Sequence, residues 1–358
     1  MRVEKKSGAT MNLREAVIET LEQRQMLTVM LAYGVLTING TPGDDVIHVH
    51  LLNGNPNTLV VEDNIDFPDF NDPRQGYYAF DVRTLSHTVS RIVINGNGGN
   101  DELVVDESYG IIRMSFSING GGSGNDTIIG GSGNDVLNGG SGDDYICGGA
   151  GNNFIYGGGG NNTIYGTMNP DDAALYGGDF NRAGSNTIYG GPGDDYIVGG
   201  PKNDRIYGGA GNDTIYGMGG NDYIDGGAGD DSLVGGNNGD LSFGSANGFC
   251  TIHGGSGDDV IQGTGNRHNY LFADTGNDTI YAGNGGDQIF GGPGIDELNG
   301  GAGNDSIQAG GSNNQLFGGT GKTRFKVGIW GDGVIQNFDP TKGDSIGSFV
   351  NTSSVVRK

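Results

Sequence analysis

A large aliphatic residue, Ile or Leu, recurs every nine positions through most of the chain between residues 121 and 308. Glycines stand seven and six positions before it and an Asp stands two positions before it, as in GGSGNDVLN (130–138) and GGAGNDTIY (208–216). The residues beside it are often Thr, Tyr or Val, which favour extended backbone. Each unit therefore predicts a tight glycine-rich turn followed by a three-residue strand with one inward side chain.

Units in the same frame repeat too often to be an accident of composition. We number the residues of a unit one to nine, so that glycines occupy positions one, two and four, the Asp position six and the aliphatic residue position eight. Two such units return the chain to its starting side, one strand spacing further along. The pattern thus predicts an all-β chain wound as a parallel β-roll or β-solenoid, with two sheets and Asp-bearing turns along both edges.

Composition and charge narrow the possible partners. The 358 residues include 75 Gly, and 43 Asp plus Glu outnumber 19 Lys plus Arg, which gives a formal net charge of -24. Nucleic acid and anionic membrane surfaces are excluded as partners because phosphate binding requires positive charge. No apolar stretch approaches the roughly 18 to 20 residues that span a bilayer. Cations are the partners that this charge favours.

The repeat itself points to calcium. One buried aliphatic side chain in nine residues cannot offset the conformational entropy that is lost when those residues become ordered. Stacking the coils also aligns Asp side chains about one strand spacing (~4.8 Å) apart, where like charges repel. A hard cation with six or more oxygen ligands relieves this repulsion, and calcium accepts such a site more readily than magnesium with its strict small octahedron. Folding is therefore expected to depend on metal binding.

The candidate calcium ligands are the Asp residues at position six. They are Asp126, Asp135, Asp144, Asp195, Asp204, Asp213, Asp222, Asp231, Asp240, Asp259, Asp278, Asp287, Asp296 and Asp305. The stretch 235–253 is counted as two half-coils, with Asp240 and Cys250 at position six. The resulting same-edge pairs are Asp126 with Asp144, Asp195 with Asp213, Asp213 with Asp231, Asp204 with Asp222, Asp222 with Asp240, Asp240 with Asp259, Asp259 with Asp278, Asp278 with Asp296, and Asp287 with Asp305. If 235–253 is one looped-out half-coil, the pairs beyond it change edge.

Departures from the pattern predict where calcium is lacking. Position six holds Asn153, Asn162 and Asn186 between residues 148 and 189, and an amide supplies an oxygen ligand without charge. We expect two calcium-binding blocks, 121–147 and 190–308, separated by a segment poor in metal. Asn269 and Asn314 are expected to weaken their turns in the same way. Asp45 and Asp101 also occupy position six, in GTPGDDVIH (40–48) and GNGGNDELV (96–104), but have no obvious same-edge partner, so the sequence leaves their role open.

The units resemble the GGxGxDxUx nonapeptides of the repeats-in-toxin (RTX, hemolysin-type) calcium-binding proteins. The resemblance covers residues 121–308. It implies a right-handed parallel β-roll in which turn carbonyls and two position-six Asp side chains, from turns one full coil apart, enclose each calcium ion.

Four regions are expected along the chain. Residues 1–33 contain a predicted amphipathic helix over 11–27, and Leu21–Leu27 resembles the LEPR-XLL segment of exported bacterial proteins, with Gln in place of Pro. Residues 34–119 are predicted to be degenerate solenoid coils, residues 120–318 the calcium-binding roll and residues 319–358 a C-terminal cap. In the cap, GDGVIQNFDPTKGDSI (331–346) resembles the segment that often closes such arrays, with Phe338 covering the last coil.

The function expected from the sequence is that of a secreted, non-enzymatic calcium-binding protein, structural or located at the cell surface. The two cysteines, Cys147 and Cys250, are expected to remain unpaired because the roll places them several coils apart. Tyr residues at position nine would form outward aromatic rows, which suggest an alternative: a calcium-dependent module that binds extracellular polysaccharide or matrix. A polysaccharide lyase or epimerase is a further alternative, although the sequence contains no catalytic constellation.

Overall fold

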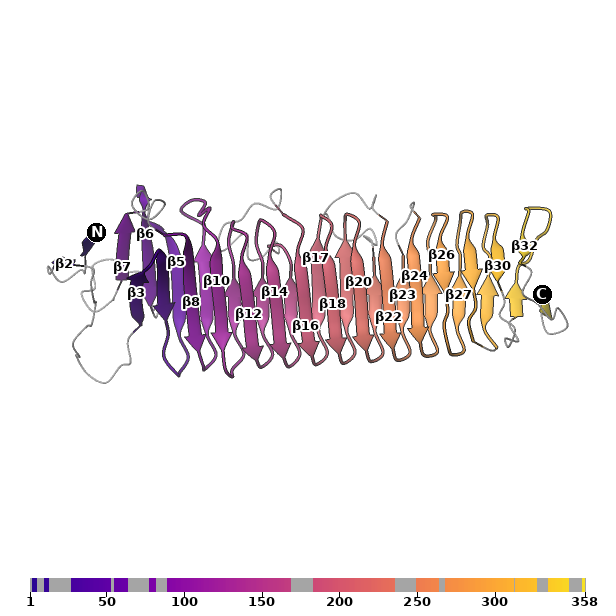
Figure 1. Ribbon diagram of the computed structural model, residues 1–358, viewed down its shortest axis with the longest axis horizontal. Helices are drawn as coiled ribbons and strands as arrows, with labels where there is room; N and C mark the ends of the chain where they lie inside the picture. Colours follow the sequence, from indigo (N-terminus) through magenta and orange to yellow (C-terminus); the bar gives the residue numbers. More distant parts are fainter. Residues whose placement is uncertain are drawn as a thin grey trace. The chain divides into compact units, whose positions relative to one another are not determined.

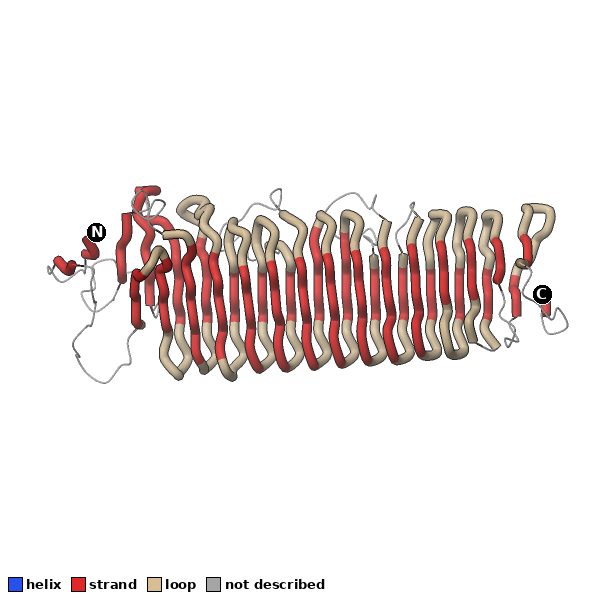
Figure 2. Tube along the Cα trace, viewed as in Figure 1, coloured by secondary structure: helices blue, strands red, loops and turns tan. Residues whose placement is uncertain are grey.

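The computed structural model describes residues 27–52, 55–63, 77–81, 89–168, 183–235, 249–263, 268–311, 313–326 and 334–347, together with the short strands Arg2–Glu4, Thr10–Asn12 and Val356–Arg357. The described residues form strands and turns, and no helix occurs among them (Figure 2). Accordingly, these ranges contain no helix with the length and apolarity of a membrane span. The chain divides into two compact units, Met1–Gly184 and Ser185–Lys358, whose boundary falls within the Asn-rich segment 148–189.

The first unit contains two sheets with mainly parallel strands. In one sheet, strands that begin with β5 pair in parallel in the order β5 (Val46–Leu52), β9 (Glu102–Asp106), β11 (Thr127–Ile129), β13 (Tyr145–Cys147) and β15 (Thr163–Tyr165). On the other side of β5, β6 (Asn55–Asp63) and β7 (Tyr77–Asp81) add in antiparallel fashion, and β1 (Arg2–Glu4) and β2 (Thr10–Asn12) follow β7. The second sheet runs β3 (Thr28–Ala32), β4 (Val35–Asn39), β8 (Arg91–Asn97), β10 (Phe116–Gly121), β12 (Val136–Ser141) and β14 (Phe154–Gly159), with only β3 antiparallel.

The second unit also has two sheets, and all of its strand pairs are parallel. One sheet runs β17 (Tyr196–Gly200), β19 (Thr214–Met218), β21 (Ser232–Val234), β23 (Val260–Gln262), β25 (Thr279–Tyr281), β27 (Glu297–Asn299), β29 (Gln315–Phe317), β31 (Val334–Gln336) and β33 (Val356–Arg357). The other runs β16 (Thr187–Pro192), β18 (Arg205–Ala210), β20 (Tyr223–Ala228), β22 (Thr251–Ser256), β24 (Tyr270–Thr275), β26 (Gln288–Phe290), β28 (Ser306–Gln308), β30 (Arg324–Lys326) and β32 (Ser345–Ile346). Successive strands alternate between the two sheets, so the chain advances by one coil for every two strands (Figure 1).

The predicted core position is confirmed. Position-eight side chains point between the two sheets of each unit, and every one that the structure describes is fully buried. The buried side chains of the regular repeats are Ile128, Leu137, Ile146, Ile155, Ile164, Ile188, Ile197, Ile206, Ile215, Ile224, Leu233, Ile252, Ile261, Leu271, Ile280, Ile289, Leu298, Ile307 and Leu316, each 0% exposed. They form narrow stacks, since each strand contributes one large inward residue.

Residues 235–253 contribute one half-coil to the roll, with a loop, so the prediction of two half-coils is wrong. Tyr223 lies opposite Thr251 and Ser232 lies opposite Val260, so only one strand, β22, separates β21 from β23 along the chain. Two half-coils would have placed Ser242 at position eight of a strand, where a polar side chain does not fill the apolar core. The aliphatic pattern itself therefore excludes the second half-coil.

Most of the predicted N-terminal helix, residues 13–26, lies outside the described residues, as does the LEPR-XLL-like segment up to Met26. The described residues of that prediction are not helical: Met11 and Asn12 belong to β2, and Leu27 leads into β3. At the other end, Phe338 lies against Phe325 of β30, with ring centroids 6.3 Å apart, which fits its predicted position over the last coils.

Candidate metal sites

The position-six Asp side chains lie inside the turns and not on their surface. Each one that the structure describes between residues 126 and 305 is at most 3% exposed. Carboxylates are rarely buried without a charged partner, because removing the charge from water is costly. A row of buried carboxylates therefore requires a specific set of contacts.

One such contact is a ladder from coil to coil. The backbone N–H at position six donates to Oδ1 of the position-six Asp one coil later, as from Asp126 to Asp144 at 2.8 Å and from Asp204 to Asp222 at 2.9 Å. The ladder confirms the predicted spatial pairs Asp126 with Asp144, Asp195 with Asp213, Asp213 with Asp231, Asp204 with Asp222, Asp259 with Asp278, Asp278 with Asp296, and Asp287 with Asp305.

Two predicted pairs are wrong. Asp222 does not pair with Asp240, nor Asp240 with Asp259, because Asp231 donates its N–H directly to Asp259 Oδ1 at 2.8 Å. Cys250 takes the place beside Asp222, with Sγ 3.9 Å from Asp222 Oδ2. Asp240 itself lies outside the described residues. Asp259 therefore lies on the same edge as Asp231. The prediction of two half-coils had placed it on the edge of Asp222.

The second unit therefore has two unlike rows of turns. The continuous row carries an unbroken series of acidic residues: Asp195, Asp213, Asp231, Asp259, Asp278 and Asp296, followed by Asn314. The interrupted row contains non-acidic residues between its Asp residues: Asn186, Asp204, Asp222, Cys250, Asn269, Asp287 and Asp305.

In the first unit, Asp135 also lacks an acidic neighbour along its row. Its Oδ1 accepts the N–H of Phe116, and its own N–H donates to Oδ1 of Asn153.

The second carboxylate oxygen is the unusual feature. Oδ2 is buried in most of the position-six Asp residues and accepts no hydrogen bond from any described residue. These residues are Asp101, Asp135, Asp144, Asp204, Asp213, Asp231, Asp259, Asp278, Asp287, Asp296 and Asp305. Buried acceptors are nearly always satisfied, so this row of orphaned oxygens indicates a missing positive partner.

The surroundings of Oδ2 fit a hard cation. A Cβ added to Gly199, the first turn residue of its unit, would lie 2.8 Å from Asp204 Oδ2 and 3.0 Å from the carbonyl oxygen of Gly217, one coil later. The carboxylate oxygen and the next turn's first carbonyl oxygen therefore face the same small space. Calcium is coordinated by this combination of carboxylate and backbone carbonyl oxygens.

Burial also changes the acidity of these groups. Desolvation raises the pKa of Asp144, Asp213 and Asp259 to about 7, and neighbouring carboxylates contribute to the increase. It raises the pKa of Asp222 to about 8, while the N–H of Asp204 opposes the shift. A cation in the turn would stabilise the charged form and reverse the effect of burial.

Where position six is not Asp, the side chain closes the turn with its own hydrogen bond. Asn186 Nδ2 donates to Gly199 O at 3.3 Å, which is the first carbonyl of the next turn on that edge. Asn153 and Asn269 make the equivalent bonds, to Gly166 O and Ala282 O. Cys250, Asn314 and Thr323 donate to the first carbonyl of their own turns, and Asn162 donates to Gly160 O within its turn. A side-chain donor thus stands where the Asp turns have an orphaned acceptor.

The residue at position five, which was not predicted to have a role, forms a second ladder. The N–H of Asn212 donates to Asp194 Oδ1 at 2.7 Å, and the N–H of Asp230 donates to Asn212 Oδ1 at 2.8 Å. The position-five ladder runs from each coil to the preceding one, opposite to the position-six ladder. Its signal in the sequence is the frequent Asn or Asp directly before the position-six Asp.

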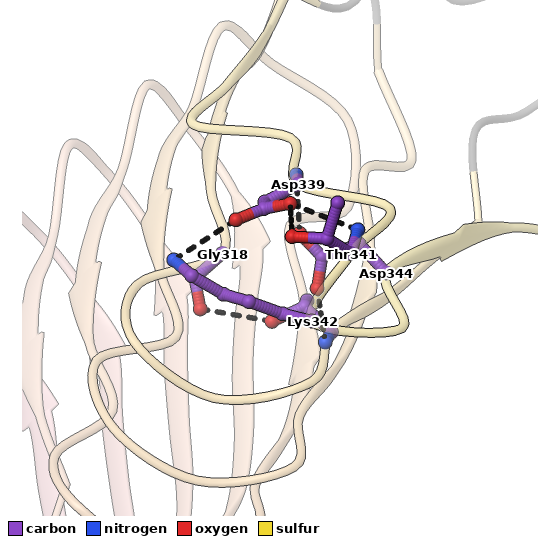
Figure 3. A network of polar contacts seen from close by, with 6 residues as sticks. Gly318, Asp339, Thr341, Lys342 and Asp344 are labelled. Atoms are coloured by element: carbon purple, nitrogen blue, oxygen red, sulfur yellow. Dashed lines mark hydrogen bonds and ion pairs between the residues drawn. The ribbon is translucent and has the colours of Figure 1, made fainter.

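The last turn of the interrupted row contains a further Asp, Asp344, that was not among the predicted residues. Asp344 Oδ1 accepts the N–H of Thr323 at 2.9 Å, which continues the ladder, and Asp344 Oδ2 accepts the N–H of Asp339 at 2.8 Å (Figure 3). Asp339 in turn accepts hydrogen bonds from the N–H and the hydroxyl of Thr341. Both oxygens of Asp344 are therefore bonded to the protein, unlike those of the Asp residues within the repeats.

Two parallel sheets, a thin aliphatic interior and carboxylates buried in stacked turns define a β-roll with cation-binding turns. The model of the RTX calcium-binding nonapeptide repeat matches residues 120–155, 148–169, 182–206, 198–233, 207–241, 251–266, 264–298 and 290–323, which together span about half of the chain. The chain belongs to this family and is a calcium-binding β-roll protein. A comparison with curated proteins finds no match.

Proposed function

We propose that calcium ions bind between successive turns and that the position-six carboxylates are their charged ligands. The observation that carries this proposal is the set of buried Oδ2 atoms that accept no hydrogen bond from a described residue, most of which face a carbonyl oxygen of the next turn. The described ligands are Asp126, Asp135, Asp144, Asp195, Asp204, Asp213, Asp222, Asp231, Asp259, Asp278, Asp287, Asp296 and Asp305. Asp240 lies outside the described residues, and Cys250 occupies the place beside Asp222 that was predicted for it.

Calcium binding and folding are coupled in this proposal. Without a cation, folding would bury carboxylates and leave their second oxygens unsatisfied, at a cost that the thin core cannot offset. Binding to the folded state alone stabilises it by mass action. In the turns of Asn153, Asn186 and Asn269 the amide already donates to a carbonyl oxygen, so these turns need no ion. Calcium is therefore assigned to the Asp turns on either side of them.

We further propose that the protein is secreted and has a structural, non-enzymatic role outside the cell. Family membership and the net charge of -24 support a role that depends on plentiful calcium. A chain that folds only with calcium would stay extended in a calcium-poor compartment and fold after export.

Circular dichroism during calcium titration tests the proposal directly. Purified full-length protein should change from a largely unordered to a β-rich spectrum on calcium addition, and excess chelator should reverse the change. Magnesium at the same concentration provides the control and should not substitute. A β-rich spectrum that persists unchanged in excess EDTA would refute the coupling of folding to calcium.

A second function, binding of extracellular polysaccharide, is favoured by an aromatic row on the outer face of β16–β26. Tyr189 stacks on Tyr207 with centroids 4.8 Å apart and planes 7° apart, and His253 stacks on Phe272 at 4.4 Å and 1°. Tyr223 links the two pairs, and Phe290 extends the row beyond Phe272. The stacked rings present a continuous strip of ring edges along which a sugar chain can lie.

A glycan array with calcium-loaded protein tests this second function. Substitution of Tyr207 and Phe272 by Ala should abolish binding, whereas Ala at Tyr281, which is 47% exposed on β25 of the other sheet, should not. An array without binding removes this function.

A further inference from the structure

Two turns near the start of the chain have the same sequence pattern but different chemistry. They are GTPGDD (40–45) and GNGGND (96–101), and both precede the segments that match the nonapeptide model. Their position-six residues, Asp45 and Asp101, are 7% and 2% exposed. The position of the Asp within its turn is the same in both, and the turns differ in the two residues after the first Gly.

The structure stacks both turns on the turn that contains Asp126. The N–H of Asp45 donates to Asp101 Oδ1 at 2.8 Å, and the N–H of Asp101 donates to Asp126 Oδ1 at 2.8 Å. Parallel pairing of β5 with β9 and of β9 with β11 sets this register. Asp101 thus has an acidic same-edge partner, Asp126, although 25 residues separate them and not the 18 of a regular coil.

The space above Asp101 has the features of the calcium sites proposed for the repeats. Asp101 Oδ2 is buried and accepts no hydrogen bond from any described residue. A Cβ added to Gly96 would collide with this oxygen and with the carbonyl oxygen of Gly120 in the next turn. A carboxylate oxygen and a carbonyl oxygen therefore converge beside the Asp126 carboxylate, as Asp204 Oδ2 and Gly217 O converge within the repeats.

The space above Asp45 has the same pair of oxygens, because a Cβ added to Gly40 would lie 2.5 Å from Asp45 Oδ2 and 2.7 Å from Gly96 O, but here the carboxylate already has donors. Asp45 Oδ2 accepts the N–H of Thr41 at 2.6 Å and lies 3.1 Å from the Thr41 hydroxyl, which also donates to it. The hydroxyl lies 3.2 Å from Asp45 Oδ1 as well. Donors of its own turn therefore surround this carboxylate where the Asp101 turn has none.

We propose that a calcium ion binds between the turns 96–101 and 120–126, with Asp101 and Asp126 as carboxylate ligands, and that the turn 40–45 binds none because Thr41 satisfies Asp45. This inference rests on the proposed function of the repeats. It extends the calcium sites into the irregular coils of the first unit, and it assigns Asp45 a structural role that needs no metal.

The test counts calcium ions in the full-length protein by native mass spectrometry at saturating calcium. Asp101→Asn should lower the number bound by one, and Asp45→Asn should leave it unchanged. Asp213→Asn, within the repeats, should lower it by at least one. Circular dichroism at saturating calcium verifies that each variant is folded.

Each outcome has a distinct meaning. If the wild type binds no calcium, the proposed function fails together with the inference. If Asp213→Asn loses calcium but Asp101→Asn does not, only the site at Asp101 is refuted. If Asp45→Asn loses calcium, the claim that the turn 40–45 binds none is refuted. Anomalous diffraction from calcium in wild-type crystals tests the same points without a variant. A peak between 96–101 and 120–126 and none above Asp45 is expected, and the reverse overturns the inference.

Discussion

The backbone N–H of Asp213 donates to Oδ1 of Asp231, 18 residues later, at 2.8 Å, while Oδ2 of both side chains is buried and accepts no hydrogen bond from any described residue. One oxygen of each carboxylate thus joins the coils directly, and the other is left for a cation. This division predicts how single substitutions change the need for calcium.

Replacing Asp213 by Asn should make its turn independent of metal. An amide at this position can donate to Gly226 O, whose counterpart in the Asn186 turn is Gly199 O. Removing a buried unsatisfied acceptor and adding a hydrogen bond should stabilise the calcium-free state by about 1–3 kcal/mol. Calcium titration followed by circular dichroism should show that the variant needs less calcium than the wild type to reach half of its β-rich signal. A greater calcium requirement would indicate that the orphaned oxygen is not destabilising.

Replacing Asn269 by Asp should have the opposite effect. Asn269 donates Nδ2 to Ala282 O at 3.3 Å, and its N–H donates to Asp287 Oδ1 at 2.7 Å. A carboxylate there would oppose the carbonyl oxygen and create an acidic pair with Asp287. We expect one additional bound calcium ion by isothermal titration calorimetry. Asn269→Gln, which adds no charge, is the control and should bind no additional ion.

Neighbouring residues on β23 provide a matched test of the thin core. Ile261 is fully buried and Val260 is 47% exposed on the outer face. Ile261→Ala should destabilise the calcium-loaded protein by about 2–5 kcal/mol, because it removes the only large inward side chain of its strand. Val260→Ala should change the stability by less than about 0.5 kcal/mol. Chemical denaturation at fixed calcium measures both, and equal effects would contradict the assigned inward and outward faces.

The calcium-free protein should be more stable in mild acid than at neutral pH. Burial raises the pKa of Asp144, Asp213 and Asp296 to about 7, against an ordinary value of about 4 in the unfolded chain. The folded state therefore binds more protons between pH ~4 and pH ~7, so stability is greatest below this window and falls as the pH rises through it.

Circular dichroism of calcium-free protein at pH 5 and pH 8 measures this dependence, and more β-structure is expected at pH 5. At saturating calcium the order should reverse, because calcium requires the charged carboxylates that protons neutralise. A calcium-free β-sheet signal that rises with pH would contradict the burial of these groups.

The cysteines provide a reporter of folding. Cys147 and Cys250 are free thiols and fully buried, and desolvation together with Asp222 raises the pKa of Cys250 to about 12. Reaction depends on an accessible thiolate, so a maleimide should label neither residue in calcium and both in chelator. Mass spectrometry gives the extent of labelling. Rapid labelling of Cys250 in saturating calcium would refute its position inside the turn.

The strands and the core could be predicted from the sequence because they depend on local pattern. Ile206 and Ile224 lie 18 residues apart in sequence and opposite each other in adjacent strands, as two nine-residue units per coil require. The same pattern argues against the two half-coils predicted for 235–253, because they would place the polar Ser242 at the inward position eight.

The individual turns could be predicted only in part, because their chemistry depends on which donors reach each carboxylate. Asp45 and Asp101 occupy the same position, but Thr41 of its own turn donates to Asp45, and no described donor reaches the second oxygen of Asp101. Asn186 appears from its sequence to be a weak ligand, whereas in the structure its amide nitrogen donates to a carbonyl of the next coil.

The sequence by itself determined the coil, because a nine-residue period fixes which side chains enter the core and which residues turn. Only the tertiary structure decided which carboxylates share an edge and which turns already contain a donor. The physical reason is that a buried oxygen is satisfied by whatever stacks on it, and the irregular coils at 96–126 and 235–250 change that neighbour without changing the local motif.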